Sequence, residues 1–474
     1  MLALTLYQLG QLYRHELPEL VAAAEASGDA AQFRRRLGEW VSRSESAQGD
    51  AGEQIRLLID YDGREVDELS TGERMPVRTL TLLWQFLTGC LENVEMRTDL
   101  FIDLFYLFKR LGGAELPPLS MQRVRIRSER WPSGLDAEVR EIRADNRERM
   151  LHLLVQKIEN RKSTPSRFRF AEGMSYEDKY RQVAIWWNDF RFHLAMAVKS
   201  PSELNRFLGN SLSAETMYLL SKARKKGMPF FATPYYLSLL DVTGKGYGDE
   251  AIRRILAAGW LVTNQLVYTV AASRRGHTTR LRQVLNALGV VCYYTFSVKG
   301  FQENYAVFTP NSRSLQEQHE EKIYGRLTPE QAGELDAELE KGGDTAERLR
   351  RFMKRHRLPF LATDRSVLNL PAIGKSMSFR LVGITPEGRR ILRFDHDRTR
   401  RHSPIIDRMG EIYIVENKSL AAYLRQLENM GEDADDYASI WNYTHGETEP
   451  RFGLYVYPDF PFGVTGRVSN LELE

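Results

Sequence analysis

The sequence predicts an α/β protein in which an all-α N-terminal domain precedes a parallel sheet, and a small α+β part ends the chain. Residues 1 to about 160 place apolar side chains at helical spacing. Short helical patterns then alternate with buried strand patterns, at 249–258, 260–270, 278–288 and 290–298. This alternation is typical of parallel α/β folds, in which a helix connects each strand to the next.

Helical patterns account for most of the N-terminal part. Leu2 to Ala24 is helical with a kink or boundary at Pro18, because proline disrupts a helix interior but fits its first turn. Thr98 to Leu111 is apolar enough to be a central helix, and Gly112 breaks it. Further helices are expected at 31–41, 76–91 and 136–161.

An aromatic segment, Trp186 to Leu194, lies within a helix expected over 177–198. Asp189 precedes His193 by about one helical turn, so the two side chains share a face. A metal site would need a third ligand, and no second histidine is nearby. We therefore interpret His193 as a core or interface histidine bonded to Asp189. Residues 228–241 then predict a strand followed by a turn.

The second half of the chain divides into a helical connector and an α+β region. The run Gly244–Gly248 matches neither GxxxxGK[ST] nor GxGxxG, so we interpret it as a linker. A strand pattern at 358–370 precedes a hairpin formed by 379–384 and 390–394. The expected domains are 1–160, helical; 161–310, α/β; 311–357, a connector of charged helices; and 358–474, α+β.

The composition excludes several classes of function. Formal charge is +3, from 66 basic and 63 acidic residues, so no global field favours nucleic acid or an anionic membrane. No apolar run reaches the roughly 18 residues of a membrane span. The N-terminus lacks the basic region of a signal peptide, which favours a cytoplasmic location. The two cysteines, Cys90 and Cys292, are 202 positions apart, and we interpret both as structural.

Two polar segments are candidate binding sites. Val367 to Leu370 is apolar, Pro371 ends the strand, and Gly374 allows a turn that presents Lys375. A desolvated lysine there can act as a nucleophilic amine; the alternative is an ordinary solvated turn lysine. The run 395–404 contains Arg398, Arg400 and Arg401, which can clamp a phosphate or carboxylate, or can belong to a solvated loop.

In the order of its segments, the chain resembles the long branch of the lysine 2,3-aminomutase-like family of radical S-adenosylmethionine enzymes. The resemblance rests on the aromatic segment 186–193, on Thr233-Pro-Tyr-Tyr-Leu-Ser-Leu-Leu, on Asn264-Gln265 in a strand, on Val291-Cys-Tyr-Tyr-Thr-Phe296, and on Val367-Leu-Asn-Leu-Pro-Ala-Ile-Gly-Lys375. It implies a (β/α) barrel, amino-acid isomerase activity, an iron–sulfur cluster, S-adenosylmethionine, and pyridoxal phosphate on Lys375 beside Gly374. The glycine run that precedes this lysine in the family is reduced here to Gly374.

The chain departs from the family at the cluster. A CxxxCxxC loop supplies three thiolates in the family, and two distant cysteines cannot replace it. Residues 229–375 are also too few for an eight-stranded barrel of about 250 residues together with the charged helices. We therefore expect an incomplete barrel-like sheet, with an internal deletion that is either natural or a gene-prediction artefact. Neither the cluster nor S-adenosylmethionine binding is expected, and no other metal site is predicted.

Three functional hypotheses remain open from the sequence. The chain is a degenerate family member that acts as a binding protein or partner subunit; or a pyridoxal-phosphate enzyme that acts on an amino acid without radical chemistry; or one half of a split aminomutase. The exposed edges of a shortened barrel favour association with a partner chain or a second copy. The amino acid that would be bound is not specified by these residues.

Overall fold

The computed structural model describes residues 1–44, 48–91, 98–131, 137–160, 167–225, 230–240, 263–298, 305–341, 343–369, 377–396, 411–447 and 449. The fold is mixed α/β, and it contains a parallel three-stranded sheet. Its contacts divide the chain into two compact units. Unit 1 comprises residues 1–129 and 258–474, and unit 2 comprises residues 130–257.

The N-terminal part of unit 1 is helical, as expected, with one small hairpin. Thr5 caps α1 through a capping box with Gln8, and Pro18 occupies the first turn of α2, so the predicted boundary at Pro18 is confirmed. The elements are α1 (Leu6–Glu16), α2 (Pro18–Glu25), α3 (Ala30–Arg43), α4 (Asp50–Tyr61), β1 (Glu65–Asp67), β2 (Arg74–Pro76), α5 (Thr79–Thr88), α6 (Asp99–Leu111) and α7 (Met121–Glu129).

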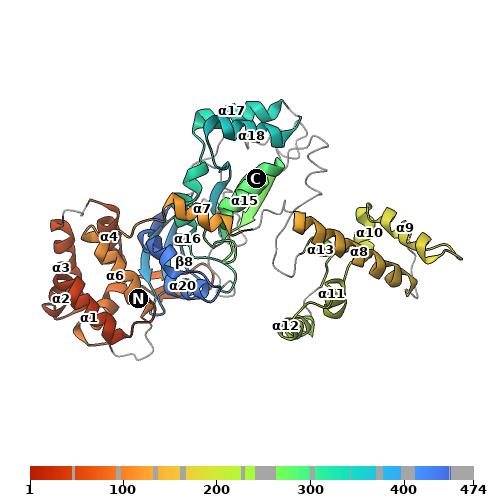
Figure 1. Cartoon of the computed structure of the whole chain (residues 1–474). Helices are drawn as coiled ribbons and strands as arrows, with labels where there is room; N and C mark the ends of the chain where they lie inside the picture. The colour runs from red at the N-terminus through yellow and green to blue at the C-terminus, as the bar shows by residue number, and fades with distance from the viewer. Residues whose placement is uncertain are drawn as a thin grey trace, which may run out of the picture. The chain divides into compact units, whose positions relative to one another are not determined.

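Helix α6 is the centre of the unit 1 core. Its apolar side chains are buried nearly all round, and Tyr13 of α1 donates a 2.6 Å hydrogen bond to the carbonyl of Phe101. The same core continues into the C-terminal residues, including Phe379 and Tyr423. Figure 1 shows the red and orange N-terminal helices beside the blue C-terminal elements. The core therefore joins 1–111 to 379–441, which the linear division into four domains does not group together.

The parallel sheet has the order β3-β4-β5. Gly289, with φ of +88°, ends the helix α15 that connects β3 to β4. The predicted strands at 260–270 and 290–298 and the helix at 278–288 are thus confirmed within the described residues, whereas the strand expected over 358–370 begins only at Arg365. The elements are β3 (Thr263–Val267), α15 (His277–Leu288), β4 (Val291–Val298), α16 (Asn311–Glu320), the 3-10 helix η2 (Lys322–Gly325), α17 (Pro329–Glu340), α18 (Thr345–His356) and β5 (Arg365–Asn369).

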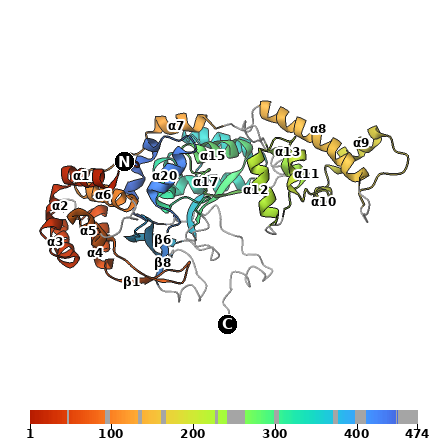
Figure 2. The ribbon, with the colours of Figure 1, turned by 90° about the horizontal axis from the view of Figure 1, so that it is seen from below.

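Helix α15 begins where the backbone of α7 approaches it closely. Gly276 has φ of +78°, and a Cβ there would lie 2.4 Å from the carbonyl carbon of Arg127 in α7. Only glycine satisfies both conditions. Figure 2 shows α7 lying across α15, so a helix from the N-terminal part covers the first crossover of the sheet.

An antiparallel sheet of order β8-β7-β6-β9 completes unit 1. The predicted hairpin around 386–388 is confirmed by β6 and β7, which pair from Met377 with His396 to Ile384 with Arg390. Gly388 has φ of +81°, and a Cβ there would lie 2.5 Å from Cβ of Asp99, so this turn packs against the start of α6. The elements are β6 (Met377–Ile384), β7 (Arg390–His396), β8 (Ile412–Val415), α20 (Leu420–Glu428), η3 (Ala434–Asn442) and β9 (His445–Gly446).

Unit 2 is an α-helical unit with its own apolar core, which includes Leu154, Val183, Phe192 and Phe207. The long helix expected over 136–161 is confirmed as α8. The strand-then-turn expected over 228–241 is wrong at 234–239, because Thr233 caps a short helix with proline in its first turn. The elements are α8 (Ala137–Glu159), α9 (Tyr176–Trp186), α10 (Phe190–Ala195), α11 (Pro201–Phe207), α12 (Ala214–Lys225) and α13 (Pro234–Leu239).

The single helix predicted over 177–198 is also wrong. The chain leaves helical geometry after Trp186, and Asp189 caps the new helix α10 by accepting from the amide of Arg191. His193 is buried, as predicted, but its Nε2 lies 2.7 Å from the carbonyl oxygen of Trp187, and its Nδ1 accepts from the amide of Tyr235. The expected bond to Asp189 is replaced because that carboxylate is used as a cap.

No helix among the described residues combines the length and apolar character needed to cross a membrane.

Candidate functional site: a lysine cavity beside a buried ion network

The sequence-predicted site residues Lys375, Gly374, Arg398, Arg400 and Arg401 lie outside the described residues. The structure does place the described ends to which their segments are attached. Strand β6 begins at Met377 and β7 ends at His396, and these two residues are cross-strand partners. The segments that carry the lysine and the three arginines are therefore attached to the same end of one hairpin.

A network of buried charges lies between the parallel sheet and its helices. Arg282 of α15 is 2% exposed and donates from Nε and Nη2 to both carboxylate oxygens of Asp364, at 3.0 and 2.9 Å. Its Nη1 donates to Glu317 of α16 at 2.6 Å. Thr295 of β4 also donates to Asp364, at 2.6 Å. The two carboxylates hold the pKa of Arg282 well above its usual value, although burial opposes the shift.

The network continues around Glu321, which follows α16. This carboxylate accepts from Arg275 at 2.7 Å, from Arg313 at 2.6 Å and from the amide of Gly276 at 2.9 Å. Burial alone would raise the pKa of Glu321, but the two guanidinium groups and the amide outweigh it and lower the pKa to about 2. Glu320 accepts from the other end of Arg275 at 2.6 Å.

Each of these buried charges has an ion-pair partner, although Nη1 of Arg313 donates to no hydrogen-bond partner among the described residues, and the adjoining cavity is small. The cavity is lined by Asn264, Thr278, Cys292 and Asp364 among others and measures about 10 Å³, which is enough for one water molecule and too little for a substrate. Burial raises the pKa of the Cys292 thiol to about 12, which fits the structural role predicted for it. We infer that the network positions the sheet against α15 and α16 rather than binding a ligand.

Sequence reasoning missed this network. The segment 311–357 was predicted to be a connector of charged helices, with no burial assigned to its charges, yet Arg313, Glu317 and Glu321 are fully buried. Their partners Arg275, Arg282 and Asp364 lie far away in the chain, so no local spacing connects the two sets. The charge density of the segment was the one available signal, and exposed helices share it.

A larger cavity, of about 450 Å³, lies at the N-terminus of α20. It is lined by Tyr305, Glu387, Arg389, Asn417, Lys418, Ser419 and Ala422. Lys418 is 1% exposed, its Nζ donates to Oε1 of Gln426 at 2.7 Å, and it lies 5.0 Å from the ring centroid of Tyr305. Burial lowers the pKa of Lys418 to about 8, although the nearby Glu416 opposes the shift. Among the described lysines, Lys418 is the one whose pKa burial lowers well below the ordinary value.

Packing against α6 fixes the walls of this lysine cavity. Ser419 caps α20 by accepting from the amide of Ala422, and it also donates to Asp99 at the start of α6. The turn that carries Arg389 is held against the same aspartate by Gly388. Both walls are thereby anchored to the central helix, which is the kind of rigid support that binding sites need.

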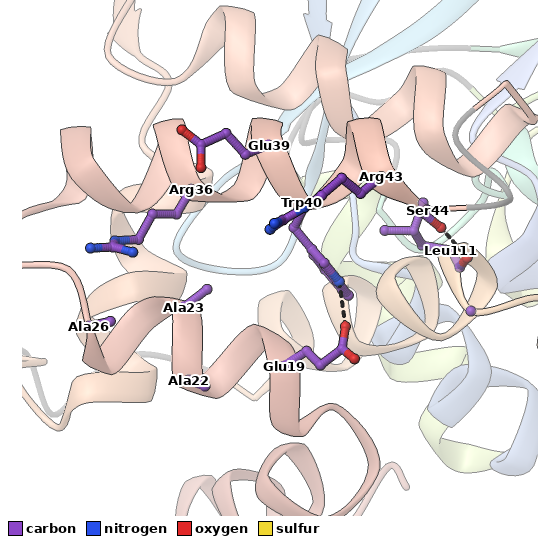
Figure 3. Close-up of a pocket in the computed structure, with 11 residues that line it drawn as sticks. Glu19, Ala22, Ala23, Ala26, Arg36, Glu39, Trp40, Arg43, Ser44 and Leu111 are labelled. Atoms are coloured by element: carbon purple, nitrogen blue, oxygen red, sulfur yellow. Dashed lines mark hydrogen bonds between the residues drawn. The ribbon is translucent and has the colours of Figure 1, made fainter.

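A third cavity, of about 660 Å³, lies between α2 and α3. Figure 3 shows Trp40 across it, with Nε1 donating to Glu19 at 2.6 Å, and Arg36 and Arg43 on the same helix. Ala22, Ala23 and Ala26 line the cavity from the side of α2. The cavity is open and carries both signs of charge, so its chemistry does not define a ligand.

These observations define a mixed α/β protein with a parallel sheet, an ionic core and a lysine cavity. A domain of unknown function, DUF8427, matches residues 1–113. The chain is similar to an uncharacterized KamA family protein of Methanocaldococcus jannaschii, with 26% identity over 199 residues. The match covers 41% of this chain and 26% of the relative, and it indicates a distant KamA-like relationship. No solved structure matches the chain.

Proposed function

We propose that the protein is a KamA-like subunit without radical chemistry of its own, which acts in an assembly with a second copy of the chain. The observation that carries the proposal is the open parallel sheet. Among the described residues, the outer strands β3 and β5 pair only with the central strand β4. Parallel sheets are normally extended by further strands and covered on both faces, so an association that covers this sheet is favourable.

The exposure of β3 supports an association at this edge. Val267 is 44% exposed although it ends a strand of the sheet, and Gln265 is exposed as well. Strand residues of this kind are normally buried in a complete parallel sheet. The sequence supports the chemical half of the proposal, because two distant cysteines cannot supply the three thiolates of a radical S-adenosylmethionine cluster.

Two measurements on the full chain test this proposal. Light scattering coupled to size-exclusion chromatography is expected to give a mass of at least twice 54.7 kDa. Val267→Lys should return the protein to the monomer, because a charge on a sheet edge blocks pairing, whereas Ile126→Lys on α7 serves as an exposed control. A stoichiometric iron–sulfur cluster in the anaerobically reconstituted chain would contradict the absence of radical chemistry.

A second proposal concerns Lys375. We propose that pyridoxal phosphate binds Lys375 as an imine, with its phosphate held by Arg398, Arg400 and Arg401 and an amino acid as the ligand. The common attachment of both segments to the pair Met377 and His396 favours this arrangement. Lys375 lies two positions before Met377, and Arg398 lies two positions after His396, so each of these distances spans at most about 7 Å.

The absorbance of the protein after incubation with pyridoxal phosphate tests the second proposal. A visible band that borohydride removes is expected in the wild type and is expected to be lost in Lys375→Ala. Arg400→Gln should weaken cofactor binding without removing the band at saturation, because a phosphate contact is lost while the imine remains. An identical band in wild type and Lys375→Ala would contradict the assignment.

A further inference from the structure

Among the described residues of unit 1, Lys322 and Lys418 are almost fully buried, and their surroundings differ. Lys322 lies against carboxylates, with Glu449 and Asp364 as ion-pair partners. In contrast, the Lys418 amine has a neutral hydrogen-bond partner, the Gln426 amide, and the face of the Tyr305 ring. A buried ammonium without a carboxylate in contact is costly, so its neutral form is favoured.

This environment makes Lys418 the best amine nucleophile among the described lysines. Burial lowers its pKa to about 8, so roughly a tenth of the amine is neutral at pH 7, compared with less than about a thousandth of a lysine at the ordinary pKa. Neutral amines attack carbonyl carbons, whereas ammonium groups do not. The cavity of about 450 Å³ beside this amine is large enough for a small organic molecule.

The other groups that line the cavity favour an anion. Arg389 has no ion-pair partner among the described residues, and the N-terminus of the nine-residue helix α20 directs its positive dipole to the same place. The opposing charges are Glu387, which is exposed on the adjacent turn, and Glu416, whose pKa is raised by burial. The guanidinium and the helix dipole therefore act on the cavity together with an amine that is partly neutral.

We propose that this cavity binds a small 2-oxo carboxylate, with its carbonyl carbon at Nζ of Lys418 and its carboxylate facing Arg389. The lone pair of the neutral amine forms the N–C bond as the C=O π bond breaks, and one proton passes from the nitrogen to the oxygen. The resulting carbinolamine loses its hydroxyl group together with the remaining N–H proton as water and gives an imine. The step is reversible, and it requires neither an oxidant nor a reductant.

Reductive trapping on the full chain tests the proposal directly. The protein is incubated with pyruvate and cyanoborohydride at pH 7.5, and the modified lysines are located by peptide mass spectrometry. Lys418 is expected to be modified at least tenfold faster than the exposed Lys341, because of its larger neutral fraction. Modification of exposed lysines with Lys418 left unmodified would overturn the proposal.

Two variants and a pH profile sharpen the result. Arg389→Gln is expected to slow trapping at Lys418 about tenfold without a change in melting temperature, because the anion loses its charge-assisted partner. Arg350→Gln on an exposed helix is the matched control and should leave the rate unchanged. The trapping rate should rise with a midpoint near pH 8; a midpoint of 10 or higher would overturn the proposal.

The position of the modified residue separates this site from the candidate pyridoxal-phosphate lysine. Lys375→Ala should leave the trapping at Lys418 unchanged, whereas Lys418→Met should abolish it. A circular-dichroism melt establishes that Lys418→Met is folded, and the Arg389→Gln result stands independently of that variant. Equal loss of trapping in Lys375→Ala would assign the reactive amine to the other segment and overturn the proposal.

Discussion

The two compact units both have an apolar core, but they differ in whether charged side chains are buried beside it. Unit 1 buries complete ion pairs, such as Arg282 with Asp364, between its parallel sheet and its helices. Unit 2 has an apolar core and leaves large apolar side chains on its surface, among them Ile185, Phe190 and Tyr236. Breaking a buried ion pair leaves an uncompensated charge, so unit 1 depends on paired charges as well as on packed volume, whereas the core of unit 2 depends on packed volume.

The two units also differ in whether the notable side chains position parts of the unit or lie exposed on its surface. In unit 1, the side chains that position the parallel sheet and the lysine cavity already have hydrogen-bond partners, as Arg282 has in Asp364 and Ser419 has in Asp99. In unit 2, an exposed apolar side chain does not stabilise the fold of the unit. Such surfaces often mark places where another chain or another part of the chain docks. The predictions below test whether the two units respond to substitution in these different ways.

The largest effect is expected from Arg282→Met. The substitution leaves the carboxylates of Asp364 and Glu317 buried without their main cation, which should destabilise unit 1 by about 4–5 kcal/mol. Urea denaturation measures the change. The control Arg350→Met removes an exposed pair and should cost at most about 0.5 kcal/mol. A similar urea midpoint for both variants would show that the buried network adds little to the free energy of unfolding.

A core substitution in unit 2 should act locally. Phe192→Ala empties a fully buried position of α10 and should cost about 3–4 kcal/mol, whereas Phe190→Ala, on the same helix at 66% exposure, should cost less than about 0.5 kcal/mol. Hydrogen exchange followed by peptide mass spectrometry measures both. Faster exchange is expected at 137–225 and not at 1–111. Equal acceleration in both regions would contradict independent cores.

Acidification should weaken unit 1 in two steps and unit 2 mainly in the first of them. The pKa of Glu321 is about 2, below its ordinary 4.5, so Glu321 stabilises unit 1 above pH 4.5, and this contribution, about 3 kcal/mol, is lost between pH 4.5 and 2. Glu416, whose pKa is raised by burial, partly offsets this loss. Burial lowers the pKa of His193 in unit 2 and of His319 and His445 in unit 1, so the stability of each unit begins to fall below pH 6.5, and the loss at Glu321 adds a second step in unit 1.

Hydrogen exchange as a function of pH separates these two contributions. Peptides of both units should begin to lose protection as the pH falls below 6.5, and peptides of 263–298 should lose further protection below pH 4.5. The variant His193→Gln should remove the step of unit 2 and leave both steps of unit 1. A change in the steps of unit 1 in this variant would show that the stabilities of the two units are coupled.

Local patterns predicted most of the elements and the central helix α6, but not the charged part of the interior. The hairpin at 379–394, the helices α17 and α18, and strand β4 follow from turn residues, helix caps and apolar runs that lie within a few positions of one another. The network around Arg282 and Glu321 and the cavity at Lys418 depend on pairs separated by many residues. The two candidate sites that the sequence alone proposed, at Lys375 and at Arg398, Arg400 and Arg401, remain predictions because they lie outside the described residues.

The smallest effect on stability, and the most direct test of the surface of unit 2, is expected from the double variant Phe190→Ser and Leu194→Ser. These residues lie one turn apart on α10, and both are at least half exposed, so the free energy of unfolding should change by less than about 0.5 kcal/mol. Removing two apolar side chains from the surface should nevertheless lower the fluorescence of a bound apolar dye and reduce self-association in light scattering, because both depend on exposed apolar area.

The substitution Tyr7→Ser, which removes an exposed aromatic ring from α1 in unit 1, is the matched control. If the two variants changed dye binding and mass equally, the apolar surface of unit 2 would be no different from isolated exposed residues elsewhere, and the contrast between the units would rest on their interiors alone.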